Sequence, residues 1–277
     1  MNVRVRRAGI AAILLSSILL AFAAVEGAAQ QRKSVPPLDK DNPLRELISG
    51  YHFNPLALRS LQDDDFDNPG FVWSAQGEKL WNQVDGTQRK SCASCHNSAN
   101  ESMRGKAGSY PKYYEPAKKV INLEQRINIC REEQMKAAPW AYESDALLAM
   151  TAFVRLQSRR TPTNVKIDGP AAQAFALGKK MYTARTGQYG MACALCHNER
   201  YGSAMRGDTI SQGHPNASPA WRMPAQKLIS LHERFKICYG LMRAEPFASG
   251  APEFVALELY LNWRANGLPL EAPAVRR

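Results

Sequence analysis

The chain contains the same ordered series of residues twice. The first copy starts at Cys92 and the second at Cys193, and each opens with Cys-x-x-Cys-His-Asn. The segment 116–130, which ends at Cys130, aligns without a gap with the segment 224–238, which ends at Cys238. The offset between the copies is the length of a domain and is too long for a solenoid repeat. The chain is therefore a tandem duplication.

Apolar residues recur at helical spacing in parts of both copies. The helices predicted in this way cover Ala146 to Leu156, Pro170 to Tyr182 and Glu253 to Trp263. Alternation typical of strands is nearly absent, and the 17 prolines and 18 glycines favour many loops. A polar segment around Pro162 separates the copies, so we place the boundary between residues 160 and 161.

The Cys-x-x-Cys-His pattern is typical of covalent c-type haem attachment. Two thiols three residues apart reach the two vinyl groups of one haem, and the adjacent histidine then ligates the iron. The sequence thus predicts two covalently bound haems, one on Cys92, Cys95 and His96 and the other on Cys193, Cys196 and His197. Paired disulfides and zinc sites are the alternatives, but zinc would need further ligands at short spacing, and these are missing. The predicted fold is mainly α, with two tandem cytochrome c-like domains at residues 30–160 and 161–277.

The N-terminal segment, residues 1–29, has the composition of a secretory signal peptide. Three arginines precede an apolar stretch that ends in small residues, and we expect cleavage after Ala29. An uncleaved membrane anchor is the alternative; we expect no stable membrane insertion. Removal of this segment lowers the net charge from +11 to about +9, and four haem propionates lower it to about +5. No nucleic-acid-binding motif accompanies this charge, which better suits an acidic docking partner.

Each haem iron has a sixth position, for which methionine is the usual ligand in electron-transfer cytochromes c. Met103 and Met205 recur in the duplication but follow the histidines too closely to reach the opposite face of a haem. Met135 and Met242 remain alternatives, and we interpret His214 and His232 as surface or packing residues.

The two remaining cysteines are better candidates for the sixth position. Cys130 and Cys238 occupy equivalent places in the two copies, each well beyond the histidine of its haem motif. A disulfide between them is the alternative, but the matching local sequence favours the same task in each copy. A thiolate ligand lowers the reduction potential of a haem iron, which suits a site with a role other than simple electron transfer.

Arg234 precedes Cys238 by four residues, so a helix would place both on one face. A guanidinium there would favour the thiolate and could bind an oxyanion in bidentate fashion. Arg126 stands at the same offset from Cys130, but Glu124 and Asn128 replace His232 and Lys236. The second site is therefore the more cationic one.

These features together resemble the SoxA family, the dihaem subunits of the SoxAX cytochromes of sulfur-oxidising bacteria. The resemblance rests on the signal segment, the two haem motifs, the further cysteine after each, and the repeated Arg-x-x-x-Cys, and it covers about residues 42–270. It implies an L-cysteine S-thiosulfotransferase, which joins thiosulfate oxidatively to a cysteine of the SoxYZ carrier protein and passes electrons to cytochrome c. It also implies a heterodimer with SoxX, a monohaem cytochrome subunit, and a location in the periplasm.

The resemblance assigns roles to individual residues. Cys238 would be the catalytic cysteine, carried as a persulfide, and also the axial ligand of the second haem. Arg234 would bind the substrate, Cys130 would be the axial ligand of the first haem, and His96 and His197 the proximal ligands.

A dihaem thiosulfate dehydrogenase, a pure electron-transfer cytochrome and a dihaem peroxidase are the rival functions.

Overall fold

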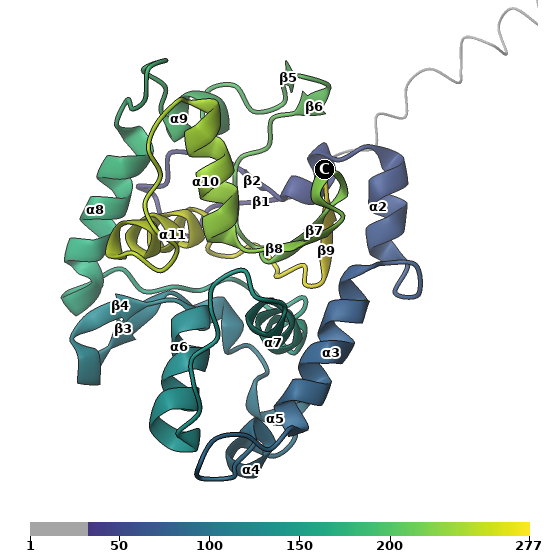
Figure 1. Cartoon of the computed structure of the whole chain (residues 1–277). Coiled ribbons are helices and arrows are strands. Elements are labelled where there is room, and N and C mark those ends of the chain that lie inside the picture. The colour runs from purple at the N-terminus through teal and green to yellow at the C-terminus, as the bar shows by residue number, and fades with distance from the viewer. Residues whose placement is uncertain (1–32) are drawn as a thin grey trace, which may run out of the picture. The chain divides into compact units, whose positions relative to one another are not determined.

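The two copies of the duplicated sequence share the order of their main elements (Figure 1). The structure, a computed structural model, describes residues 33–277; the predicted signal segment lies outside the described residues. In the first copy the helices and strands are α3 (Gly70–Asn82), α4 (Cys92–His96), α5 (Ala99–Ser102), β3 (Lys112–Tyr114), β4 (Lys119–Ile121), α6 (Leu123–Cys130) and α7 (Asp145–Leu156). In the second they are α8 (Ala172–Thr183), α9 (Cys193–His197), β5 (Ala204–Met205), β6 (Asp208–Thr209), β7 (Ala220–Arg222), β8 (Lys227–Ile229), α10 (Leu231–Leu241) and α11 (Pro252–Arg264), so that the hairpin of β5 and β6 follows the cysteine–histidine helix where α5 follows it in the first copy. The predicted mainly α fold and its three helices are confirmed.

One long helix pair crosses in each copy, α3 with α7 and α8 with α11. Gly77 and Gly178 lie at these crossings, at equivalent places in the two copies. A Cβ atom on Gly77 would lie 2.2 Å from the carbonyl oxygen of Ala149, and one on Gly178 would lie 2.0 Å from that of Ala256. The backbones approach so closely that only glycine fits at either crossing.

A short hairpin leads into the helix that carries the last cysteine of each copy. Strand β3 pairs antiparallel with β4 and β7 with β8, in the same register, with Lys112 opposite Ile121 and Ala220 opposite Ile229. A 3-10 turn joins the strands, η3 (Glu115–Ala117) in one copy and η6 (Met223–Ala225) in the other. This shared structure explains why the sequences match there without a gap.

The copies differ after the last cysteine. In the first copy a π-helical turn, η4 (Arg131–Met135), follows α6, whereas α10 continues as an α-helix. The carbonyls of Met135 and Met242 nevertheless lie in equivalent places, since a Cβ on Gly86 would be 2.1 Å from the first and one on Gly187 would be 2.1 Å from the second. Met135 is one residue further from its cysteine than Met242 is, so the π-turn accommodates the extra residue.

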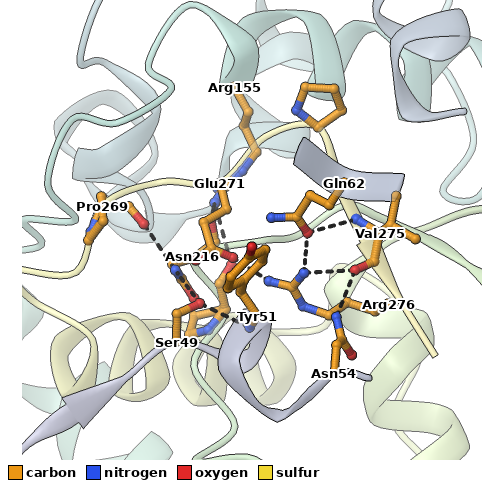
Figure 2. Close-up of polar contacts among 12 residues, drawn as sticks. Ser49, Tyr51, Asn54, Gln62, Arg155, Asn216, Pro269, Glu271, Val275 and Arg276 are labelled. Atoms are coloured by element: carbon orange, nitrogen blue, oxygen red, sulfur yellow. Dashed lines mark hydrogen bonds and ion pairs between the residues drawn. The ribbon is translucent and has the colours of Figure 1, made fainter. Parts of the chain in front are cut away.

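Segments from both sides of the duplication cover the second copy. These are β1 (Ser34–Val35), β2 (Leu47–Ile48), η1 (Gly50–Phe53), α2 (Leu56–Asp63) and β9 (Ala274–Arg276). Strand β9 pairs in parallel with β7, and Ile48 N–H donates to Oε1 of Gln212 at 2.7 Å. Figure 2 shows the guanidinium of Arg276 held among Gln62, Glu271 and the Val275 carbonyl. The domain boundary at residue 160 stays a prediction, and residues 34–63 add contacts to the second copy.

Each copy has its own apolar core. In the first, Trp81, Met150 and Phe153 pack beneath α6; in the second, Phe254 and Tyr260 pack beneath α10. Burial of side chains of this size stabilises by roughly 1.5–3 kcal/mol each. Two 3-10 turns, η2 (Ala107–Ser109) and η5 (Gly169–Ala171), complete the described elements. In residues 33–277 no helix is long and apolar enough to cross a membrane.

A buried polar cluster joins the copies where α6 and α10 begin. Glu258 Oε2 accepts a hydrogen bond from Asn122 at 3.1 Å and lies 3.1 Å from Nε2 of His232. The pKa of the neighbouring Glu124 is raised to about 7, first by burial and then by the charge of Glu258, with His232 and Arg155 opposing the rise. The cluster therefore holds a carboxyl group that titrates near neutral pH.

Candidate functional site

Each Cys-x-x-Cys-His sequence forms one short helix. Helix α4 carries Cys92, Cys95 and His96, and α9 carries Cys193, Cys196 and His197. The side chain of Ser91 caps α4 by accepting the backbone N–H of Ser94 at 3.1 Å. None of the six cysteines forms a disulfide in the structure. Four of them are thus positioned, in pairs on one helical turn, for thioether bonds to a haem.

The third cysteine of each copy faces the cysteine pair of its own copy. Burial raises the pKa of Cys92 to about 11, and the neighbouring charge of Cys130 contributes to the rise. Burial likewise raises the pKa of Cys193 to about 11, with Cys238 as the next contributor. After burial, charge on Cys238 also raises the pKa of Cys196. This grouping favours the same local task for Cys130 and Cys238 over a disulfide between them.

The second histidine is oriented for metal binding. His197 Nδ1 lies 2.7 Å from the carbonyl oxygen of Ser211, so a proton on Nδ1 is donated there and Nε2 keeps its lone pair for a metal. Burial lowers the pKa of His197 to about 4, which keeps the ring neutral. Gly213 lies against the ring, where an added Cβ would be 2.9 Å from Cγ of His197.

An aromatic side chain holds the asparagine after each histidine. Trp81 on α3 donates from Nε1 to the carbonyl of Asn97 at 3.1 Å, and its ring centroid lies 5.8 Å from that of His96. Tyr182 on α8 donates to Oδ1 of Asn198 at 2.9 Å. The two copies thus fix the loop after the histidine in related ways.

The donor sets fit covalent c-type haem. Each copy offers two cysteines, one histidine on the same helical turn and a third cysteine from a facing helix, α6 or α10. In residues 33–277 no group of three or more His, Cys, Asp and Glu side chains could hold a bare metal ion. The zinc alternative therefore has no support in this part of the chain.

The predicted substrate residue Arg234 lies on α10, one turn before Cys238. Its charge acts on His197 and on a further arginine, Arg222, at the end of β7. The pKa of Arg222 is lowered to about 9, first by burial and then by the charges of Arg234 and Arg276, while charge on Cys238 and Asp208 opposes the shift. The site around Cys238 therefore contains two arginines, of which the sequence predicted one.

A comparison of the copies could have revealed Arg222. It stands at the place that Tyr114 occupies in the repeated hairpin, so the alignment shows an arginine in one copy and a phenol in the other. Lys236, which the sequence placed near Cys238 as a further charge, lies 3.5 Å from Oε2 of Glu233 and forms an ion pair with it.

The other ligand candidates have different roles. Met103 packs against the first core and Met205 is 41% exposed on a short hairpin. His214 and His232 are buried, and each faces a side-chain oxygen, that of Gln212 at 2.9 Å and that of Glu258 at 3.1 Å. Both histidines are thus packing residues and neither lies on the surface.

The chain matches known proteins over most of its length. The SoxA/TsdA cytochrome c domain model matches residues 76–163 and 177–270. The L-cysteine S-thiosulfotransferase subunit SoxA of Rhodovulum sulfidophilum is 41% identical over 83% of this chain and 80% of its own. The SoxA subunit of Paracoccus pantotrophus is 39% identical over 88% of this chain and 84% of its own. The crystal structure of SoxXA from P. pantotrophus superposes with a TM-score of 0.84 and 39% identity, covering 89% of this chain and 93% of that one. The chain therefore belongs to the SoxA family, a family of cytochrome c fold with covalently bound c-type haem, as its two cysteine–histidine motifs predicted.

Proposed function

We propose that the chain is the catalytic subunit of an L-cysteine S-thiosulfotransferase. In this reaction thiosulfate joins a cysteine thiol of the carrier protein SoxYZ, and electrons pass to cytochrome c. The observation that carries the proposal is the group formed by Cys238, Arg234 and Arg222, with Cys193 and Cys196 opposite Cys238. The names of the SoxA relatives and the structural match to SoxXA support it.

Two covalent haems complete the proposed protein, one on each cysteine–histidine helix. Cys92, Cys95, His96 and Cys130 would hold the first, and Cys193, Cys196, His197 and Cys238 would hold the second. A haem bound here supplies an acceptor for single electrons. Ser211 would fix the ring of His197 through its carbonyl oxygen, in the way that outer hydrogen bonds orient metal ligands.

The proposed reaction balances as a two-electron oxidation. A carrier thiol and the thiosulfate dianion give a carrier S-thiosulfonate, one proton and two electrons. A sulfur–sulfur bond forms, the thiol loses its proton to solvent, and the electrons leave to cytochrome c. Arg234 would bind the sulfonate oxygens of thiosulfate, since a guanidinium matches a planar pair of oxygen acceptors. The sulfur of Cys238, carried as a persulfide, would lie beside the reacting sulfur atoms.

The proposed partners follow from the same match. We infer a heterodimer with SoxX, which supplies a further haem, and transient contact with SoxYZ, all in the periplasm. The positive charge near Cys238 suits an acidic carrier surface, because complementary charges accelerate encounter. The predicted signal segment is consistent with this location.

Turnover by the haem-loaded heterodimer with SoxYZ and thiosulfate tests the proposal. We expect Cys238→Ser to abolish formation of the carrier adduct, whereas the matched variant Cys130→Ser keeps most of it. Mass spectrometry of the peptide that contains Cys238 should show the addition of one sulfur atom. Oxidation of thiosulfate to tetrathionate without carrier, at the full rate, would instead assign a thiosulfate dehydrogenase. Full transferase activity of Cys238→Ser would overturn the proposed mechanism.

A further inference from the structure

The surroundings of the third cysteine differ sharply between the copies. Near Cys130, the guanidinium of Arg126 lies 5.2 Å from the centroid of the Tyr114 ring, and the Tyr114 hydroxyl donates to Glu133 at 3.4 Å. The charge of Glu133 also acts on Cys130. The first copy therefore covers its arginine with a phenol and adds a carboxylate, which does not favour an anion.

The second copy has cationic or apolar groups at those places. Arg222 stands where the first copy has Tyr114, and the residues between Cys238 and Met242, which are Tyr239, Gly240 and Leu241, include no counterpart of the carboxylate of Glu133. Arg234, the counterpart of Arg126, is half-buried, and no described residue forms an ion pair with it. These two differences turn a balanced site into one with an excess of positive charge.

Arg222 is fixed in place, but part of its guanidinium has no partner in the protein. One terminal nitrogen donates to a backbone oxygen of Arg277, the last residue of the printed sequence, at 2.7 Å, while Nε is enclosed by protein and has no hydrogen-bond partner in the described structure. Asp208, the carboxylate that acts on it, is 2.8 Å from Arg277 and paired with that residue. A buried nitrogen without a hydrogen-bond partner is costly, so the protein alone satisfies the Arg222 guanidinium only in part.

Arg276, the third arginine nearby, is not available for a ligand. Its guanidinium is bound to Glu271, Gln62 and the Val275 carbonyl, as Figure 2 shows. Arg222 and Arg234 are therefore the two arginines around Cys238 that form no ion pair with a described Asp or Glu side chain. Two like charges held close together repel each other, and a bound dianion relieves the repulsion.

We propose that Arg222 is a second anion-binding residue, which with Arg234 holds the sulfonate group of thiosulfate beside Cys238. This inference rests on the proposed function and names the residue that adapts the second copy to its substrate. A sulfonate presents three oxygens, enough for one guanidinium on each side. The hydrogen bond to Arg277 fixes the guanidinium in advance, so little side-chain freedom is lost on binding.

The test replaces Arg222 by the residue of the first copy. In the haem-loaded heterodimer, Arg222→Tyr should weaken the binding of thiosulfate. The KM for thiosulfate in turnover, and the Kd for thiosulfate measured by calorimetry without the carrier, should both rise by roughly tenfold to a hundredfold. The kcat of Arg222→Tyr should fall by less than about threefold. Arg222→Lys should recover part of the affinity, because lysine keeps the positive charge but cannot make the bidentate contact of a guanidinium. Arg200→Tyr, which removes the same charge from an exposed position in the same copy, should leave KM and Kd within about twofold of the original.

Two results would overturn the proposal. One is an unchanged KM and Kd in Arg222→Tyr at normal haem content. The other is an unchanged Kd together with a shifted haem spectrum or reduction potential, which would assign Arg222 to a haem propionate instead. The Kd is measured without carrier, so it decides the role of Arg222 even if the unsubstituted heterodimer forms no carrier adduct and the proposed function fails.

Discussion

The buried carboxyl group of Glu124 should make stability depend on pH. Its pKa in the folded protein is raised from 4.5 to about 7, first by burial and then by Glu258, with His232 and Arg155 opposing. A folded pKa above the unfolded one means that stability is complete below about pH 4.5 and falls as the pH rises through 7. A rise of the pKa from 4.5 to about 7 corresponds to about 3 kcal/mol of lost stability at alkaline pH.

Glu124→Gln removes this ionisation while keeping the size of the side chain. Urea unfolding of the haem-loaded protein, followed by circular dichroism, would give the free energy of unfolding of both proteins at pH 5 and pH 8. The stability of Glu124→Gln relative to the unsubstituted protein should rise by about 2.5 kcal/mol between pH 5 and pH 8. The exposed neighbour Glu132, changed to Gln, should show no such movement. A difference that stays constant within about 1 kcal/mol would refute the reasoning.

Three further predictions concern packing and ligation. Gly178→Ala should lower the free energy of unfolding by about 3 kcal/mol, measured by urea titration, because its Cβ would lie 2.0 Å from the carbonyl oxygen of Ala256. Gly213→Ala should shift the visible spectrum of the second haem and destabilise by about 1–2 kcal/mol, since its φ is +71° and its Cβ would press on His197. A variant that keeps both the spectrum and the unfolding midpoint would contradict this. Cys130→Ala should leave the haem covalently attached by mass, but change the absorption spectrum and raise the reduction potential of the first haem.

The local structure of the copies was largely predictable from the sequence. Helix α7 follows the apolar spacing of residues 146–156, and the gapless match around Cys130 and Cys238 predicted two equivalent elements. The grouping of each third cysteine with its own pair also follows from the duplication. The signal segment, the domain boundary and the ligand roles stay predictions.

What the sequence did not show depends on contacts between distant segments. The environment of Arg222 is set by Arg277, 55 residues later, through a strand pairing that no local pattern indicates. The cluster of Glu124 and His232 forms because the two copies place their equivalent helices end to end across Glu258. The spacing of apolar residues predicts which face of a helix or strand is buried, but it does not predict which other element covers that face.

The second copy is completed by contacts between segments that lie at opposite ends of the described chain. Asn54 donates to the carbonyl of Val275, 221 residues away, and Asn42 donates to that of Arg264, 222 residues away. Contacts of such high contact order form late, because a long loop must close first. In a chain made from its N-terminus, the first copy can therefore pack while the second still lacks its last strand. We therefore expect the second copy, which carries Cys238, to complete its packing only after strand β9 is in place.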